Sequence, residues 1–239
     1  MSTQNTTVLK APKLRYEKPG NYWLLIFPVT AFGLGTWQVK RRTWKLNLIK
    51  QLEDNLYLPP VDLPENLSEV QNMSYRKVKV KGKFDHSQEV YIGPRNLITK
   101  NEKKEGGLIS SFSKATNGYF VVTPFELSDG RGKILINRGW VPRRKLDPKT
   151  REAGQVNDEV TIIGVVRESE KRPPFGLKNE PAVKQFHHRD IEQIAELLGT
   201  LPIFLDADEN STVKGGPIGG QTKVSLRNEH MNYIITWWV

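Results

Sequence analysis

The sequence predicts an α+β protein that is anchored in a membrane by an N-terminal helix and continues into an antiparallel, partly closed β domain. Three observations predict this fold. Residues 21–39, NYWLLIFPVTAFGLGTWQV, contain no charged side chain. Residues 70–229 hold a series of short strand-like runs with one or two helices. Residues 231–239, at the end of the sequence, are again almost free of polar side chains, and we interpret 230–239 as the start of an incomplete second span.

Composition limits the classes of protein that the chain can belong to. The 239 residues have room for one or two domains, and 26% charged against 37% hydrophobic residues is typical of a folded, mainly water-exposed chain. The absence of cysteine excludes disulfides, zinc–thiolate sites and thiol catalysis.

The net charge of +10 is unevenly distributed. Residues 1–20 carry +3 and residues 21–50 carry +5, which leaves +2 for residues 51–239. Proteins that follow a phosphate backbone usually carry a basic surface over a whole domain. We therefore expect no nucleic-acid partner, and a basic OB-like nucleic-acid-binding module remains the weaker alternative.

A transmembrane helix is predicted over residues 20–39, after a polar and basic N-terminal segment at 1–19. About 20 apolar residues at 1.5 Å each cross a ~30 Å hydrocarbon core. Tyr22, Trp23 and Trp37 fit the aromatic belts of the membrane interface. A signal peptide, the main alternative, would need a small-residue cleavage site that this run lacks.

An amphipathic helix is predicted to continue the span over residues 40–58. Trp44, Leu48, Leu52 and Leu56 recur at helical spacing between basic residues. The helix should end before the prolines at 59–60, which cannot continue it.

The β-rich domain is predicted over residues 70–229, with a mobile loop at 96–118 that is too polar for a core. The helix DIEQIAELLG has Asp190 as its N-cap and Gly199 as its C-cap, and SDGRG (128–132) is a hairpin turn. The expected strands are 75–84, 89–93, 119–127, 133–141, 159–167, 202–207 and 222–227.

We expect no enzyme, because each candidate for catalysis has a simpler interpretation. His187 and His188 are adjacent, so on a strand they point to opposite faces. Asp206 and Asp208 resemble a metal-binding pair but have no further carboxylate cluster nearby, which favours turn residues. The glycine-rich KGGPIGGQTK (214–223) lacks the spacing of a nucleotide-binding loop and indicates a flexible hairpin tip or a close backbone contact.

A basic segment at residues 131–145 is the local exception. It carries +6 in fifteen residues without an acid. One interpretation is a solvated hairpin end. The other is a site for lipid phosphates, cofactor carboxylates or a partner, formed by Arg138, Arg143 and Arg144 with Trp140 as an apolar floor.

Four motifs, FGLGTWQVKRRTWKLNLI, NRGWVP, GGPIGGQT and NEHMNYIITW, occur in this order. Together they resemble the Surfeit locus protein 1 family, assembly factors of cytochrome c oxidase, from about residue 32 to the C-terminus. The resemblance implies a mitochondrial inner-membrane protein with two transmembrane helices and a domain in the intermembrane space. It also implies a role in forming the haem a centre of the catalytic subunit of the oxidase. The expected partners are that subunit, other assembly factors and inner-membrane lipid.

The resemblance assigns haem a binding to the histidine of the NEH motif, which is His230 here. A neutral imidazole is a good ligand for haem iron. On a helix, Tyr233 and Trp237 would share its face and could lie along the flat macrocycle. The alternatives are an ordinary interfacial histidine, and a membrane-anchored scaffold that binds oxidase subunits without haem. Residues 231–239 would reach roughly 14 Å, half the thickness of the hydrocarbon core.

Overall fold

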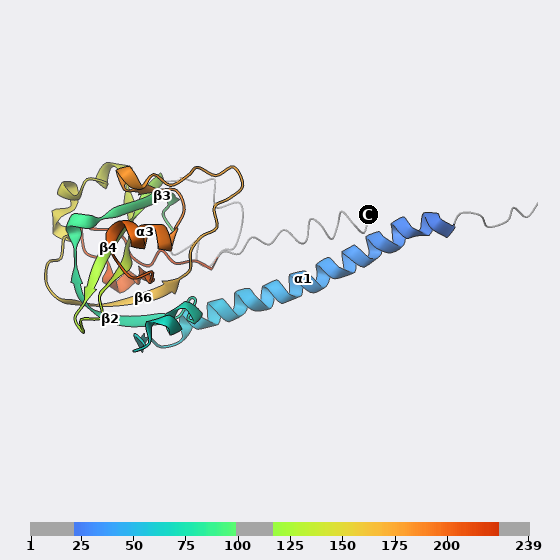
Figure 1. Cartoon of the computed structure of the whole chain (residues 1–239), viewed down its shortest axis with the longest axis horizontal. Helices are drawn as coiled ribbons and strands as arrows, with labels where there is room; N and C mark the ends of the chain where they lie inside the picture. The colour runs from blue at the N-terminus through green and yellow to red at the C-terminus, as the bar shows by residue number, and fades with distance from the viewer. Residues whose placement is uncertain (1–21, 99–116, 225–239) are drawn as a thin grey trace, which may run out of the picture. The chain divides into compact units, whose positions relative to one another are not determined.

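The computed structural model describes residues 22–98 and 117–224 (Figure 1). Residues 47–226 belong to one compact unit, and the chain before them belongs to another. The helices are α1 (Ile26–Tyr57) and α3 (Ile191–Leu198). The strands are β1 (Val61–Asp62), β2 (Lys77–Phe84), β3 (Val90–Asn96), β4 (Asn117–Leu127), β5 (Lys133–Pro142), β6 (Val160–Arg167), β7 (Gln185–Phe186) and β8 (Phe204–Ala207). Short 3-10 turns are η1 (Tyr22–Leu25), η2 (Leu67–Asn72), η3 (His86–Gln88), η5 (Arg143–Lys145), η6 (Pro148–Gly154), η7 (Pro181–Val183) and η8 (Glu209–Ser211).

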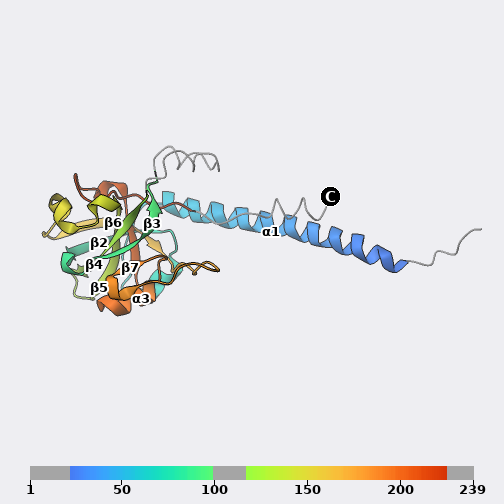
Figure 2. The same ribbon diagram turned by 90° about the horizontal axis from the view of Figure 1, so that it is seen from above.

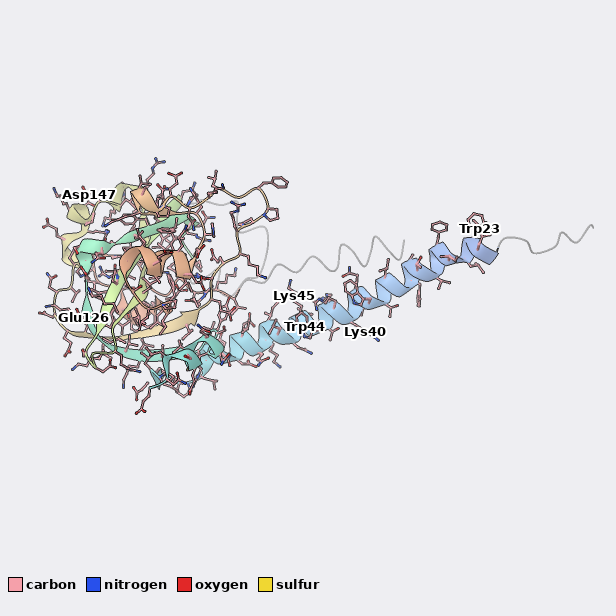
Figure 3. All side chains as sticks on the ribbon, viewed as in Figure 1. Trp23, Lys40, Trp44, Lys45, Glu126 and Asp147 are labelled. Carbon is pink, nitrogen blue, oxygen red and sulfur yellow. The ribbon has the colours of Figure 1, made fainter. Side chains whose placement is uncertain are left out.

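α1 is one continuous helix that follows the turn η1. Pro28 does not interrupt it, because it lies in the first turn, where its missing N–H has no intrahelical partner to lose. The helix ends at Tyr57, since the prolines at 59–60 disfavour helical geometry before them. Lys40, Trp44 and Lys45 project from α1 (Figure 3).

The part of the chain that the structure describes contains no helix with the length and mean hydropathy needed to cross a membrane. The helix expected over residues 20–39 is present as η1 and α1, from Tyr22 to Tyr57, and its crossing of a membrane stays a prediction. The second span predicted from residue 230 lies outside the described residues.

The sheet closes into a barrel. β2, β6, β8, β5 and β4 follow one another in hydrogen-bonded order, and β2 pairs again with β4 to complete the ring. β4 can take part twice because it is long: its C-terminal end pairs with β2, with Phe84 opposite Phe125, and its N-terminal part pairs with β3. The predicted partly closed sheet is therefore fully closed.

Three pairings correct the prediction of an antiparallel sheet. β1 with β2, β3 with β7 and β5 with β8 are parallel. β1 and β7 have two residues each, too few to produce a recognisable alternation. β8 can lie parallel to β5 because the long connection between them, through β6 and α3, allows a crossover. The strand expected at 222–227 is not formed over 222–224, and the rest of it lies outside the described residues.

Two apolar cores result from this arrangement. Alternate residues of β2, including Val78 and Val80, are buried inside the barrel with Ile134, Ile136 and Leu205. The second core lies outside the barrel, where α3 covers β3, β4 and β5 (Figures 1 and 2).

α3 has the predicted caps, and these predictions are confirmed. The Asp190 carboxylate accepts the Gln193 N–H at 3.0 Å, and Gly199 has φ 63°. The hairpin turn at 128–132 is also confirmed, since it joins the antiparallel strands β4 and β5. The loop predicted at 96–118 falls mainly on residues 99–116, which are not described, and both of its ends belong to the strands β3 and β4.

Candidate functional site

A β-bulge in β5 places Arg138 at one end of the barrel. In the pairing with β4, Arg138 is the extra residue between Asn137 and Gly139. Bulges redirect side chains and are common beside functional sites. The Arg138 guanidinium lies over the ring of Phe84, with Cζ 4.9 Å from the ring centroid, and its side chain is only 6% exposed. A cation is therefore held in the apolar end of the barrel.

The residue after Arg138 must be glycine. Gly139 has φ 130°, and a Cβ built on it would lie 2.0 Å from the carbonyl oxygen of Ile218. Ile218 belongs to the glycine-rich segment 214–223. This segment pairs with β5, since Trp140 and Ile218 exchange two backbone hydrogen bonds of 2.9 Å each. The close backbone contact predicted for the glycine-rich segment at 214–223 is confirmed.

Glu89 is the carboxylate that faces Arg138. Its side chain is 2% exposed, and Arg151 binds both of its oxygens, with Nη1 3.2 Å from Oε1 and Nη2 2.5 Å from Oε2. The Arg151 side chain is fully buried, and the backbone leaves helical geometry there, with φ −143° and ψ 37°. Arg138 contacts the same carboxylate less closely, with Nη1 3.8 Å from Oε1, beyond hydrogen-bond range. The buried carboxylate is thus shared unequally.

The remaining polar contacts of Arg138 are with a backbone carbonyl and an imidazole. Its Nη2 donates to the carbonyl oxygen of Gly154, and its Nη1 lies 3.4 Å from His86 Nδ1. His86 Nε2 lies 2.8 Å from the carbonyl oxygen of Val156 and carries a hydrogen, because a carbonyl can only accept. His86 Nδ1 also lies 3.5 Å from Glu89 Oε1. The imidazole therefore lies between the Arg138 guanidinium and the Glu89 carboxylate.

Burial and charge shift the ionisation of this cluster in opposite directions. Burial opposes ionisation of Glu89, but hydrogen bonds from His86 and Arg151 and the charges of both arginines outweigh it and lower the pKa of Glu89 to about 2. Burial lowers the pKa of Arg138 to about 10, and the neighbouring Arg151 adds to that effect. Burial also disfavours the Arg151 cation, but Glu89 outweighs this and raises the pKa of Arg151.

A pocket of about 210 Å³ opens beside Arg138. It lies at the end of the barrel where β2 finishes, β6 begins and β8 finishes. Mouths of β-barrels are frequent ligand sites. Arg138 is the charged side chain of the lining, which consists of Phe84, Arg138, Val156, Val160, Thr161, Ile162, Ala207, Asn210, Ser211, Thr212 and Val213. The arrangement can hold an anion next to a buried cation.

A second cluster of ion pairs repeats the pattern of one glutamate between two arginines. Arg95 Nη2 lies 2.5 Å from Glu170 Oε2, and Arg189 Nη2 lies 3.4 Å from Glu170 Oε1. Burial raises the pKa of Glu170, but the charges of Arg189 and Arg95 outweigh this and lower it overall. The Glu170 side chain is 31% exposed, so solvent reaches this cluster.

The structure does not gather the four residues predicted as one anion site. Arg138 is buried beneath the pocket, and Trp140 is buried with its indole N–H donating to the carbonyl oxygen of Arg95 at 2.9 Å. Arg143 and Arg144 are exposed on the turn η5. That turn leads to Asp147, at the surface of the domain in Figure 3.

The haem residues predicted from the resemblance, His230, Tyr233 and Trp237, lie outside the described residues. Over 22–98 and 117–224, no group of three or more histidines and carboxylates could hold a metal ion. Asp206 accepts from Asn137 at 2.7 Å and pairs with Arg167, and Asp208 caps η8.

Sequence reasoning did not identify His86, Glu89 or Arg151. Glu89 and Arg151 are 62 residues apart in the sequence. All three residues stand in polar stretches that resemble surface turns. One signal was available. Glu89 directly precedes the alternating strand residues Val90 and Ile92, and a charge at the end of a buried strand indicates an ion pair.

Taken together, the fold and the pocket define the class: a small β-barrel protein with an N-terminal helix and a buried cationic site at the barrel mouth. The sequence profile of the SURF1 family matches residues 25–239, and the chain belongs to this family. It is 54% identical over 216 residues to Surfeit locus protein 1 of Homo sapiens, covering 90% of this chain and 71% of that protein. It is 50% identical over 238 residues to Surfeit locus protein 1 of Rattus norvegicus, covering 99% and 76%. It is 43% identical over 221 residues to the SURF1-like protein of Drosophila melanogaster, covering 92% and 73%.

Proposed function

We propose that this protein is a non-enzymatic assembly factor for cytochrome c oxidase, respiratory complex IV. The observation that carries the proposal is membership of the SURF1 family over residues 25–239. The resemblance of the sequence motifs to oxidase assembly factors supplies the role.

The finer proposal is that the protein helps form the haem a centre by binding and presenting haem a. His230 would supply the ligand to the iron, since a neutral imidazole suits that position, and Tyr233 and Trp237 would lie along the macrocycle. In the assembled oxidase, the bound haem a supplies the redox centre. The role of this chain would be to hold it and release it to the catalytic subunit.

The place of action that we propose is the mitochondrial inner membrane, with the β domain in the intermembrane space. The partners there would be the catalytic subunit, other assembly factors and inner-membrane lipid. Alkaline extraction of isolated mitochondria measures membrane attachment, and protease treatment of intact and swollen organelles measures on which side the barrel lies. Protection of the barrel after selective rupture of the outer membrane would contradict this location.

Absorption spectroscopy tests the haem proposal. The full chain, purified from membranes that synthesise haem a, should carry the haem a absorption bands, and His230→Ala should remove them. His187→Ala is the matched control, because it removes another histidine, one that lies in the described barrel domain. Unchanged bands in His230→Ala would end the assignment of the iron ligand.

Complementation separates a haem-presenting factor from a scaffold. In cells that lack the resident family member, the full chain should restore assembled oxidase and its haem a content, and His230→Ala should not. If His230→Ala restored both fully, the protein would act as a scaffold that binds oxidase subunits without haem. Failure of the intact chain to restore any oxidase would contradict the assembly role itself.

A further inference from the structure

We propose that the pocket at the barrel mouth binds a small organic carboxylate, with the carboxylate against Arg138 and an apolar body against the barrel wall. This inference goes beyond the assembly role and uses none of His230, Tyr233 or Trp237. It depends on the charge balance of the buried cluster, the lining of the pocket and its size.

The buried cluster carries more positive than negative charge. Arg138 and Arg151 are both buried, and Glu89 is the carboxylate that pairs with them within the described residues. Arg151 occupies both oxygens of Glu89 at hydrogen-bond distance, whereas Arg138 stays 3.8 Å away. The charge of Arg138 is therefore only partly neutralised, and a buried charge without a full partner is costly.

An anion in the pocket would complete the neutralisation of Arg138. Arg138 is part of the pocket lining, so a ligand in the pocket can reach its guanidinium. The same guanidinium also contacts Gly154 O and His86, which are protein groups without a negative charge to offer it. Burial lowers the pKa of Arg138 because it disfavours the cationic form of the side chain. A second anion would stabilise that cationic form.

The lining selects a carboxylate with an apolar body rather than a phosphate. Phe84, Val160, Ile162 and Ala207 provide an apolar wall, and polar side chains stand only in the lining segments around Thr161 and 210–212. A phosphate would need several cationic donors, whereas a carboxylate matches one guanidinium. An aromatic or aliphatic acid would place its polar end on Arg138 and remove its apolar end from water.

Size limits the ligand further. A volume of about 210 Å³ corresponds to roughly seven water molecules. The proposed ligand is therefore of the size of benzoate or a short-chain fatty acid, well below the size of a macrocycle.

The binding experiment uses two probes of the same shape, 4-fluorobenzoate and the uncharged 4-fluorobenzamide. Each is titrated into the full chain at neutral pH and followed by fluorine NMR. We expect the carboxylate to bind at least tenfold more tightly than the amide. Equal affinity of the two probes, or no saturable binding of the carboxylate, would overturn the proposal.

Two variants locate the bound carboxylate. Arg138→Met should weaken binding of 4-fluorobenzoate at least tenfold. Because that change touches the ion cluster, a second variant, Val213→Trp, fills the pocket from a half-buried position of its lining and leaves the residues of the cluster in place. It should abolish binding and leave the circular dichroism spectrum and thermal midpoint unchanged. Val183→Trp, at an exposed position away from the pocket lining, is the matched control and should bind like the original chain. Normal binding in Val213→Trp would show that the carboxylate binds elsewhere and would overturn the site.

Discussion

The two clusters of ion pairs share one plan and differ in their contact with water. In each, a glutamate lies between two arginines: Glu89 between Arg138 and Arg151, and Glu170 between Arg95 and Arg189. The side chain of Glu89 is 2% exposed and that of Glu170 is 31% exposed. Water can solvate the charges around Glu170, whereas the Glu89 carboxylate depends on protein groups for its charge partners. The same residue types therefore make an ordinary surface network in one place and a candidate binding site in the other.

The largest expected effect is from Glu89→Gln. It leaves two buried guanidinium groups without a carboxylate, and breaking a buried pair costs about 3–5 kcal/mol in the free energy of unfolding. Urea unfolding followed by tryptophan fluorescence measures this loss. A loss below about 1 kcal/mol would mean that water enters the cluster and that the comparison with Glu170 fails.

Acid should destabilise the protein through Glu89. Its pKa in the folded chain is about 2 against an ordinary value of 4.5. A carboxylate with a depressed pKa contributes stability above the ordinary value and loses it as the pH falls through the folded one. The unfolding free energy should therefore drop between about pH 4.5 and pH 2, by about 3 kcal/mol from this group.

Glu89→Gln is the control for this pH dependence, because other carboxylates titrate in the same range. The difference in unfolding free energy between the original chain and the variant should shrink as the pH falls below about 4.5. A difference that stayed constant down to pH 2.5 would contradict the assignment of the shift to Glu89.

Glu170→Gln should have a smaller effect. It removes an ion pair that solvent already screens, so we expect a loss of about 1 kcal/mol in unfolding free energy, and the loss should shrink further in high salt. Parallel urea titrations at low and high salt give both values. A loss as large as that of Glu89→Gln would show that exposure does not separate the two clusters.

The smallest effects are expected at the exposed basic turn. Arg143→Ala and Arg144→Ala should each change the unfolding free energy by less than about 0.5 kcal/mol and leave carboxylate binding at the barrel mouth unchanged. Thermal unfolding and the fluorine NMR titration test both parts. A clear loss of binding would return these residues to the anion site.

Much of the fold could be predicted from local patterns. The alternation of β2, the turn at 128–132 and the caps of α3 are all encoded within a few neighbouring residues. The closure between β2 and β4 and the parallel position of β8 could not be predicted, because they depend on which strands meet over long separations.

The candidate site was predicted only through Arg138. A basic segment at 131–145 pointed to an anion, but the register of β5 decides which of its arginines faces inward. The bulge turns Arg138 into the barrel, whereas Arg143 and Arg144 follow on an exposed turn. Glu89 and Arg151 were missed because their pairing exists only in the folded chain.

The late position of β8 in the sequence has a consequence for how the chain folds. β8 lies between β5 and β6, so both of those strands keep an unsatisfied backbone edge until Phe204–Ala207 have been made and have docked. Unpaired edges of nearly complete sheets readily join to other chains. A nascent molecule is therefore at greatest risk of aggregation shortly before β8 docks, and a holding chaperone would have most to protect in that interval.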